Sequence, residues 1–206
     1  MAGFFCTDKH IISRVMFMLS VEIFKTKVGI SFSFFAVVAL MLLLEGQSSE
    51  SLLVVLLCCV LHEMGHILTM CLCSVPPKEV VLYGGGIRIS PDRSKMLSEN
   101  KDALILSAGC VVNILLALIT AVITQGVNLF VSANLFLGAF NLMPVKYFDG
   151  GRLLSAVLKD SILERIIRYL FIAAFGAVII VMIYNGFFSV SIIVTFVYII
   201  TAEFLL

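Results

Sequence analysis

The sequence predicts an all-α integral membrane protein, a bundle of six transmembrane helices with a small membrane-edge β-hairpin after the second helix. Composition gives the first reason, because 61% of the residues are hydrophobic and 13% are charged, whereas soluble proteins have about 25% charged residues. The second reason is six apolar segments long enough to cross, or nearly cross, a hydrocarbon core about 30 Å thick. The third is that the basic residues fall on alternate connections between these segments.

The six predicted spans are joined by short connections and form a single membrane-embedded domain covering residues 1–206. A helix rises about 1.5 Å per residue, so a span needs about 20 residues. The predicted spans cover residues 28–44, 52–73, 103–124, 127–143, 166–184 and 187–206. We expect residues 1–27 to be cytoplasmic, either as an amphipathic stretch on the inner leaflet or as a disordered basic arm.

The lysines and arginines set the predicted orientation in the membrane. All 14 lie before the first span, between or beside spans two and three, or between or beside spans four and five. The connections at residues 45–51, 125–126 and 185–186 contain none. Because basic residues are retained on the cytoplasmic side, we expect a multi-pass protein with both termini in the cytoplasm. A net charge of +1 gives no support for a nucleic-acid surface.

A β-hairpin is predicted in the connection after the second span. Residues 79–90 have β-branched side chains on both sides of three consecutive glycines, Gly84, Gly85 and Gly86. Two such runs separated by a glycine-containing turn are typical of a hairpin. A plain surface loop is the alternative.

The second span contains the sequence His62-Glu63-Met64-Gly65-His66, in which ionisable side chains interrupt an apolar run. Placing a glutamate at the centre of a transmembrane helix costs about 2.5–3.5 kcal/mol, so an offsetting interaction is expected. The spacing places both imidazoles one turn apart on one helix face, where they can bind a single Zn²⁺ ion. Glu63 is then placed to act on a water molecule. The motif indicates metal-dependent hydrolysis inside the membrane.

A zinc ion needs a third protein ligand, and Asp149 is the best candidate among the few carboxylates. It follows Pro144, where we expect the fourth span to unwind, because proline lacks a backbone donor and disfavours helical geometry in the preceding residue. Gly150 and Gly151 then permit close approach of the backbone. A capping aspartate at the start of the next helix is the alternative.

The sequence His-Glu-Met-Gly-His in one span, followed by Asn-Leu-Met-Pro and Asp-Gly-Gly-Arg-Leu near the end of a later one, resembles the site-2 protease family of intramembrane zinc metalloproteases. The resemblance extends from about residue 28 to about residue 166. It implies that His62, His66 and Asp149 bind zinc and that Glu63 is the general acid and base.

The same resemblance implies a substrate class and a location. The expected substrate is a membrane-tethered regulatory protein, such as a pro-sigma or anti-sigma factor, cleaved in or near its transmembrane segment. The compact plan is most similar to the stage IV sporulation protein FB branch, which implies a bacterial cell membrane, a possible role in sporulation and separate membrane proteins as regulators.

Further residues are interpreted through this resemblance. Residues 107–113 resemble the family's Ala-Gly-Pro-x-x-Asn motif, with Cys110 in the place of the usual proline. Asn113 and Asn141 either orient the substrate carbonyl and stabilise the oxyanion, with Asn141 favoured, or form ordinary hydrogen bonds between helices. The glycines of the hairpin are expected to lie where an extended substrate segment docks by strand addition.

Two other classes of protein fit parts of the pattern. A membrane metal-binding or transport protein would carry several ionisable residues along its spans, but the other deep interiors are nearly free of them. A catalytically inactive relative would be expected to lack one of the four site residues, and all four are present. The six cysteines fit small buried hydrophobic residues better than a metal or redox pair such as Cys71 and Cys73.

Overall fold

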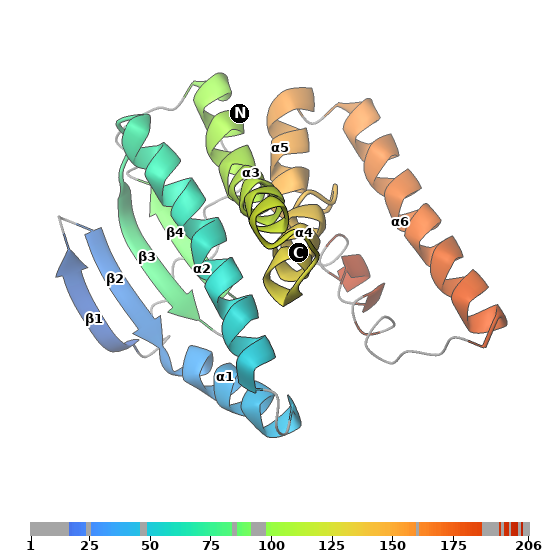
Figure 1. The fold of residues 1–206 in the computed structure, drawn as a ribbon. Coiled ribbons are helices and arrows are strands. Elements are labelled where there is room, and N and C mark those ends of the chain that lie inside the picture. Colours follow the sequence, from blue (N-terminus) through green and yellow to red (C-terminus); the bar gives the residue numbers. More distant parts are fainter. Residues whose placement is uncertain are drawn as a thin grey trace. The chain divides into compact units, whose positions relative to one another are not determined.

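The computed structural model describes residues 17–23, 26–45, 49–83, 86–91, 98–159 and 161–186, together with residues 194, 196, 197, 199–201 and 203. It divides into two compact units. The first comprises Met1–Leu56 and Met70–Met96, and the second comprises Leu57–Thr69 and Leu97–Leu206. Figure 1 labels the strands and helices of both.

The first unit is built on a four-stranded sheet with the strand order β1-β2-β3-β4. β1 (Phe17–Ile23) pairs antiparallel with β2 (Thr26–Ser31), and β2 pairs in parallel with β3 (Pro77–Tyr83). β4 (Gly86–Pro91) is the antiparallel partner of β3. The predicted hairpin is therefore confirmed as β3 and β4, but it is half of a larger sheet (Figure 1).

This sheet corrects the expectation for the N-terminal part of the chain. Residues 17–23 form β1 and not a disordered arm, and β2 occupies the start of the first predicted span. Helix α1 (Phe32–Glu45) begins only after β2 and has 14 residues, a length of about 21 Å. β2 forms at this point because it contacts residues distant in the sequence. The Thr26 hydroxyl at its start donates a 2.8 Å hydrogen bond to the Pro77 carbonyl of β3, 51 residues further along the chain.

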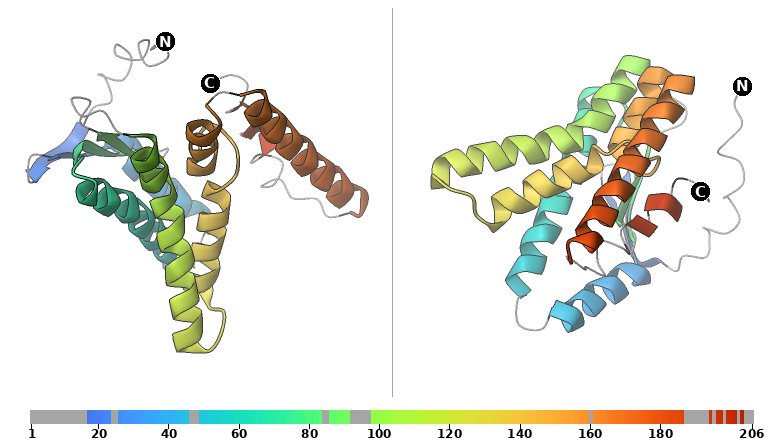
Figure 2. Two further views of the ribbon diagram at one scale, coloured as in Figure 1. Left: turned by 90° about the horizontal axis from the view of Figure 1, so that it is seen from above. Right: turned by 90° about the vertical axis from the view of Figure 1, so that its right-hand side faces the viewer.

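The second unit is helical. It contains the middle of α2 (Ser49–Leu72), α3 (Glu99–Thr124), α4 (Leu129–Asn141), α5 (Asp149–Leu158) and α6 (Ile162–Tyr184). α3 and α4 form an antiparallel helical hairpin (Figure 2). The chain reverses at Gln125, which has left-handed backbone geometry, and α4 begins at Asn128, whose side chain accepts a 2.9 Å hydrogen bond from the Val131 N–H. α5 then packs on α3.

Three helices among the described residues are long and apolar enough to cross a membrane. These helical stretches are Glu50–Leu72, Asn100–Thr124 and Ile162–Tyr184, and they match the predicted second, third and fifth spans. Val122 and Ile180 on these helices are 78% and 69% exposed, as expected for side chains that face lipid. α4 has 13 residues, about 20 Å, which is shorter than the predicted fourth span. Most of the last predicted span, residues 187–206, lies outside the described residues.

A small hydrophobic core fixes the segment between α4 and α5. Val145, Phe148 and Ile199 are buried at its centre. The side chains packed against them are Phe140, Met143, Phe171, Ile172 and Phe175. Each fully buried apolar side chain of this size stabilises the fold by about 1.5–3 kcal/mol. These contacts hold the segment against α6 and so determine where α5 begins.

Candidate metal centre

Helix α2 places two imidazoles side by side in the interior of the second unit. His62 and His66 lie one turn apart and are 5% and 8% exposed. Their ring centroids are 4.8 Å apart, with an angle of 80° between the ring planes. Their Nε2 atoms are 3.2 Å apart. The spacing predicted from the sequence therefore brings both Nε2 atoms to one point.

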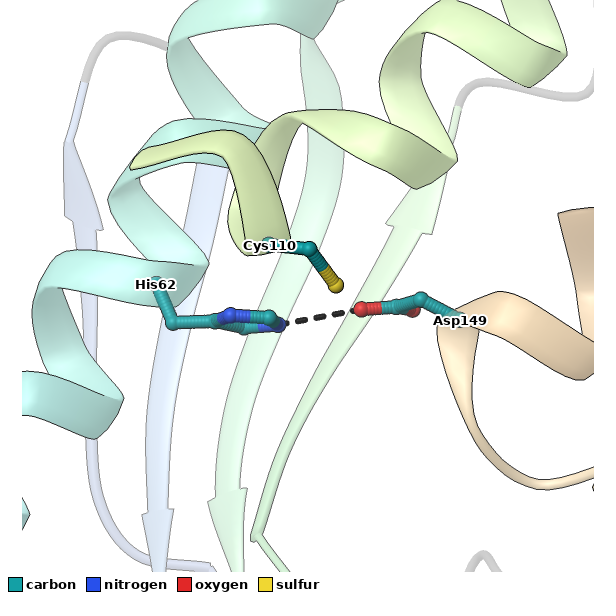
Figure 3. Close-up of side chains that lie close together, drawn as sticks. All are labelled: His62, Cys110 and Asp149. Atoms are coloured by element: carbon teal, nitrogen blue, oxygen red, sulfur yellow. Dashed lines mark hydrogen bonds and ion pairs between the residues drawn. The ribbon is translucent and has the colours of Figure 1, made fainter. Parts of the chain in front are cut away.

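The segment between α4 and α5 brings Asp149 to the same point. Its Oδ2 lies 3.0 Å from the Nε2 atom of each histidine, and Figure 3 shows the carboxylate directed at His62. Phe148, and not Asp149, is the N-cap residue of α5. A Cβ atom on Gly151 would collide with the Val145 carbonyl, so glycine is required for the chain to fold back on the first turn of α5.

A carbonyl group of α3 fixes the proton on His66. Because a carbonyl can only accept, the Nδ1–H of His66 is the donor in the 2.7 Å hydrogen bond to Ile105. In the neutral ring, Nε2 then carries a lone pair, and this lone pair faces a carboxylate oxygen that is itself an acceptor. Metal-binding histidines commonly donate their other ring N–H to a carbonyl in this way.

The three acceptor atoms fit a zinc ion. Ligand atoms about 2.0–2.1 Å from a tetrahedral zinc ion lie about 3.3 Å from one another. The observed separations are 3.0, 3.0 and 3.2 Å. A cation among the three atoms would also satisfy lone pairs that otherwise face each other. Two imidazoles and one carboxylate are a ligand set that zinc takes in catalytic sites.

Helix α3 leaves room for the imidazoles at Gly109. A Cβ atom at this position would lie 2.6 Å from His62 Nε2 and closer still to His66 Nε2. Gly65 makes the matching approach from α2, because its Cβ atom would lie 3.0 Å from the Ala108 carbonyl oxygen. The two glycines allow α2 and α3 to approach closely beside the site, and the absence of a side chain at Gly109 creates space for the metal ligands.

The pKa of the Asp149 carboxyl is lowered, which favours its ionised form. Burial alone would raise its pKa, but the adjacent imidazoles of His62 and His66 outweigh burial and hold the pKa of the carboxyl well below its usual range. Arg152 Nη1 lies 3.8 Å from Asp149 Oδ1. Because the Arg152 side chain is 62% exposed, this ion pair contributes little to stability. The ionised carboxylate is the form that binds metals.

The other predicted site residues, Glu63, Asn113 and Asn141, differ in burial and in hydrogen bonding. Glu63 follows His62 on α2 and is half-buried. Asn113 is 0% exposed, and both polar atoms of its side chain lack a hydrogen-bond partner among the described residues. Asn141 Nδ2 donates a 3.0 Å hydrogen bond to the Leu137 carbonyl of its own helix. Within the described part of the chain, neither asparagine is hydrogen-bonded to the histidines or the aspartate.

The glycines predicted to dock a substrate strand belong to the first unit. Gly84 and Gly85 lie outside the described residues, and Gly86 begins β4. The outer strands of the sheet are β1 and β4. Docking at these glycines therefore stays a prediction.

A buried charged cluster, the Arg168 cluster, contacts α5, the helix that begins at Asp149, and was not predicted from the sequence. Arg168 is 4% exposed, and Glu164 and Glu203 are each 5% exposed. Arg168 Nη2 donates a 3.0 Å hydrogen bond to the Gly151 carbonyl and a 2.7 Å hydrogen bond to Glu164 Oε1. Its Nη1 lies 3.3 Å from Glu203 Oε1, and Glu203 Oε2 accepts a 3.1 Å hydrogen bond from the Lys146 backbone N–H.

Two features of the sequence point to this cluster in retrospect. Glu164 and Arg168 have the i,i+4 spacing that brings side chains together on a helix. Arg168 and Glu203 both lie inside predicted spans, where an ionisable residue is costly unless it finds a partner. Gly151 and Glu203, two other partners of Arg168, are distant from it in the sequence, so the sequence alone indicates that a contact is needed but not where it lies.

Cys110 of α3 also lies at the metal centre. Its Sγ atom and the ligand atoms of His62 and Asp149 all lie within 4.8 Å of one another. Figure 3 shows the sulfur directed between these two side chains. The thiol is 1% exposed. Burial was predicted for this residue, but its place beside two metal-ligand candidates was not. Cys58, by contrast, is buried with its Sγ accepting a 3.1 Å hydrogen bond from Asn134 Nδ2.

Comparison with known proteins identifies a family and a similar solved structure. The family model of peptidase family M50 matches residues 50–132 and 121–184. Among solved structures, the site-2 protease from Methanocaldococcus jannaschii is similar with a TM-score of 0.60 and 19% sequence identity, over 90% of this chain and 94% of that chain. At this identity the likeness concerns the fold. No curated protein sequence matches the chain.

Proposed function

Since the chain belongs to peptidase family M50, the site-2 proteases, we propose that it is an intramembrane zinc metalloprotease with its centre at His62, His66 and Asp149. The observation that carries the proposal is the convergence of three ligand atoms from α2 and α5 at separations of 3.0, 3.0 and 3.2 Å. α2 and α3, which enclose this point, both have the length and apolar character of membrane spans. The scissile peptide bond is therefore hydrolysed within the membrane.

Each residue of the centre has a distinct task. His66 is held in the ligating tautomer by its hydrogen bond to Ile105, and Asp149 supplies the negative charge that favours a divalent cation. Zinc bound there would polarise the substrate carbonyl and lower the pKa of a water molecule. Glu63, next to His62 on α2, takes a proton from the attacking water and transfers it to the leaving amine.

Asn113 is proposed to orient the substrate carbonyl, in preference to Asn141, which the sequence favoured. Leaving a buried polar group without a hydrogen bond costs about 1–3 kcal/mol, and both polar atoms of the Asn113 side chain lack a partner among the described residues. A substrate amide or carbonyl would supply one. Asn141 already donates to its own helix, so it has less to gain from a substrate.

The proposed substrate is a membrane-tethered regulatory protein, such as a pro-sigma or anti-sigma factor. Its cleaved segment must be extended, because a helix hides each peptide bond in an i→i−4 hydrogen bond. The outer strands β1 and β4 offer backbone donors and acceptors for such a segment by strand addition. With both termini in the cytoplasm, as the basic residues indicate, cleavage releases a cytoplasmic product. Separate membrane proteins would act as regulators.

A co-expression assay tests this proposal. A membrane-tethered pro-sigma or anti-sigma candidate is expressed with wild type, with Glu63→Gln or with Glu50→Gln, and its cleavage is followed by immunoblotting at equal enzyme levels. Glu63→Gln keeps the size of the side chain but removes the base, so cleavage is expected to disappear. The matched control is Glu50→Gln, because Glu50 is exposed in the first turn of α2. This variant should cleave the substrate like wild type.

The other outcomes separate the alternatives. Equal cleavage by wild type and Glu63→Gln contradicts the assignment of the base. Absence of cleavage with every candidate, while the purified protein holds one zinc ion per chain, favours an inactive relative. Zinc uptake into vesicles that depends on Asp149 favours a transport protein.

A further inference from the structure

Cys110 lies where a further ligand of the metal centre would lie. We propose that its thiolate is a fourth protein ligand of the zinc ion in the substrate-free protein. The resting centre then consists of two imidazoles, one carboxylate and one thiolate. The inference rests on the proposed function, because it requires a zinc ion at His62, His66 and Asp149.

The separation of the ligand atoms supports this assignment. Before any ion is bound, the sulfur of Cys110 and the ligand atoms of His62 and Asp149 lie within 4.8 Å of one another. In a tetrahedral site with zinc–sulfur bonds of about 2.3 Å and zinc–nitrogen bonds of about 2.0 Å, sulfur and nitrogen lie about 3.5 Å apart. The difference is at most about 1.3 Å, which is small enough for side-chain adjustment.

The backbone of α3 explains why the sulfur reaches this point. At Gly109 the helix lies so close to the imidazoles that a Cβ atom would be 2.6 Å from His62 Nε2. The next side chain, that of Cys110, therefore starts from a backbone already in contact with the metal ligands. It is 1% exposed, and Figure 3 shows its sulfur directed toward the His62–Asp149 contact.

The chemistry of the thiol also suits the ion. Cysteine thiolate is among the usual zinc ligands, and zinc accepts mixed sulfur, nitrogen and oxygen sets. When the zinc–sulfur bond forms, the thiol loses its proton to water; when the bond breaks, the sulfur takes a proton back. No oxidant or reductant takes part. A zinc ion with four protein ligands is closed, whereas catalysis needs an open position, so water and substrate must displace Cys110 before hydrolysis.

Cys58 provides the matched comparison within the same unit. It is 0% exposed and so at least as buried as Cys110. Its sulfur, however, accepts a 3.1 Å hydrogen bond from Asn134 Nδ2, which gives it a packing role on α2. Replacing either cysteine by alanine removes one buried thiol, but only Cys110→Ala removes a sulfur atom from the metal centre.

X-ray absorption at the zinc edge tests the inference on the full-length protein, purified with zinc and without substrate. Wild type and Cys58→Ala are expected to have one sulfur neighbour at about 2.3 Å, and Cys110→Ala is expected to have nitrogen and oxygen neighbours only. Cobalt-substituted protein should show a thiolate charge-transfer band that is lost in Cys110→Ala alone. The zinc affinity of Cys110→Ala should fall by at least about tenfold.

The outcomes distinguish this inference from the proposed function. A wild-type protein that binds one zinc ion with nitrogen and oxygen neighbours alone overturns the role of Cys110 and leaves the three-ligand centre intact. A wild-type protein that binds no zinc overturns both. If Cys110→Ala does not fold, Cys110→Ser is measured in its place, since serine preserves size and removes the sulfur. A sulfur neighbour that persists in the folded variant also contradicts the inference.

Discussion

Arg168 of α6 and Gly151 of α5 are joined by a 3.0 Å hydrogen bond from the guanidinium Nη2 to the Gly151 carbonyl. Gly151 lies two residues after Asp149, so this bond ties the turn that carries the carboxylate to a helix of membrane-span length. The same guanidinium is paired with the buried carboxylates of Glu164 and Glu203. One buried cation is therefore shared between two buried anions, and it positions the first turn of α5.

We predict that Arg168→Met weakens zinc binding without removing a ligand. The variant leaves two buried carboxylates unpaired, which destabilises a fold by about 3–5 kcal/mol, and it releases the Gly151 carbonyl. Disturbed support of a metal ligand typically reduces affinity by about 10–100-fold, measured by competition with a zinc-sensitive dye. Arg168→Lys should restore part of the affinity, because it keeps the charge but not the forked donor geometry.

Arg165→Met is the matched control for this prediction. Arg165 lies on the same helix and is exposed, so its removal should leave zinc affinity and thermal stability unchanged. Wild-type affinity in a folded Arg168→Met protein would show that the cluster does not position Asp149.

Gly109→Ala is expected to abolish zinc binding through a single added methyl group. The new Cβ atom would lie 2.6 Å from His62 Nε2, well inside van der Waals contact, and must displace the imidazoles or separate α2 from α3. Overpacking of this kind costs about 1–3 kcal/mol. Zinc content after gel filtration, determined by mass spectrometry, measures the loss.

The control for this substitution is Gly126→Ala at the end of α3. There the nearest atom to an added Cβ is the Thr124 carbonyl oxygen at 3.8 Å, an ordinary contact. This variant should keep the zinc content of the wild type. Full zinc content in Gly109→Ala as well would mean that the metal is bound elsewhere.

Asp149→Asn should reduce zinc affinity by at least about 100-fold. This exceeds the loss expected when a residue that only supports a metal ligand is replaced. The amide has the size of the carboxylate but lacks the negative charge, and it is a poorer zinc ligand. Circular dichroism should be unchanged, because Asp149 is not the N-cap residue of α5. Asp102→Asn, at an exposed position of α3, is the control; an equal loss in both variants would indicate a general charge effect.

Removal of the metal should lower thermal stability reversibly. A ligand present at 100 times its dissociation constant stabilises the folded state by about 2.7 kcal/mol. Chelation is therefore expected to lower the melting temperature of wild type, and added zinc to restore it. Asp149→Asn should melt at the same temperature with and without chelator. A wild-type melting temperature that does not respond to chelator would argue against a zinc ion in the fold.

The local features of the site were predictable from sequence because they depend on residues a few positions apart. The spacing of His62 and His66 fixes them on one face of α2, and the structure places their Nε2 atoms 3.2 Å apart. Hydropathy predicted six spans, of which the second, third and fifth correspond to helices of membrane-span length among the described residues. The glycines between β-branched runs identified the β3–β4 hairpin. Asp149 was named as a candidate, with capping as its alternative.

The features that sequence analysis missed depend on contacts between distant residues. β2 forms because β3 is available as a parallel partner, and no local pattern in residues 26–31 shows this. Cys110 has the character of a small buried residue in sequence, and only the approach of α3 at Gly109 places its sulfur beside His62 and Asp149.

The sequence by itself determined the membrane environment, the helical character and the kinds of side chain at the site, because hydropathy and helical spacing are properties of neighbouring residues. The tertiary structure alone decided that Asp149 meets both histidines, that Ile105 fixes the tautomer of His66 and that Arg168 supports the turn after Asp149. These relationships join different helices. Their geometry follows from how closely the helices pack, which glycine and buried side chains set at each contact.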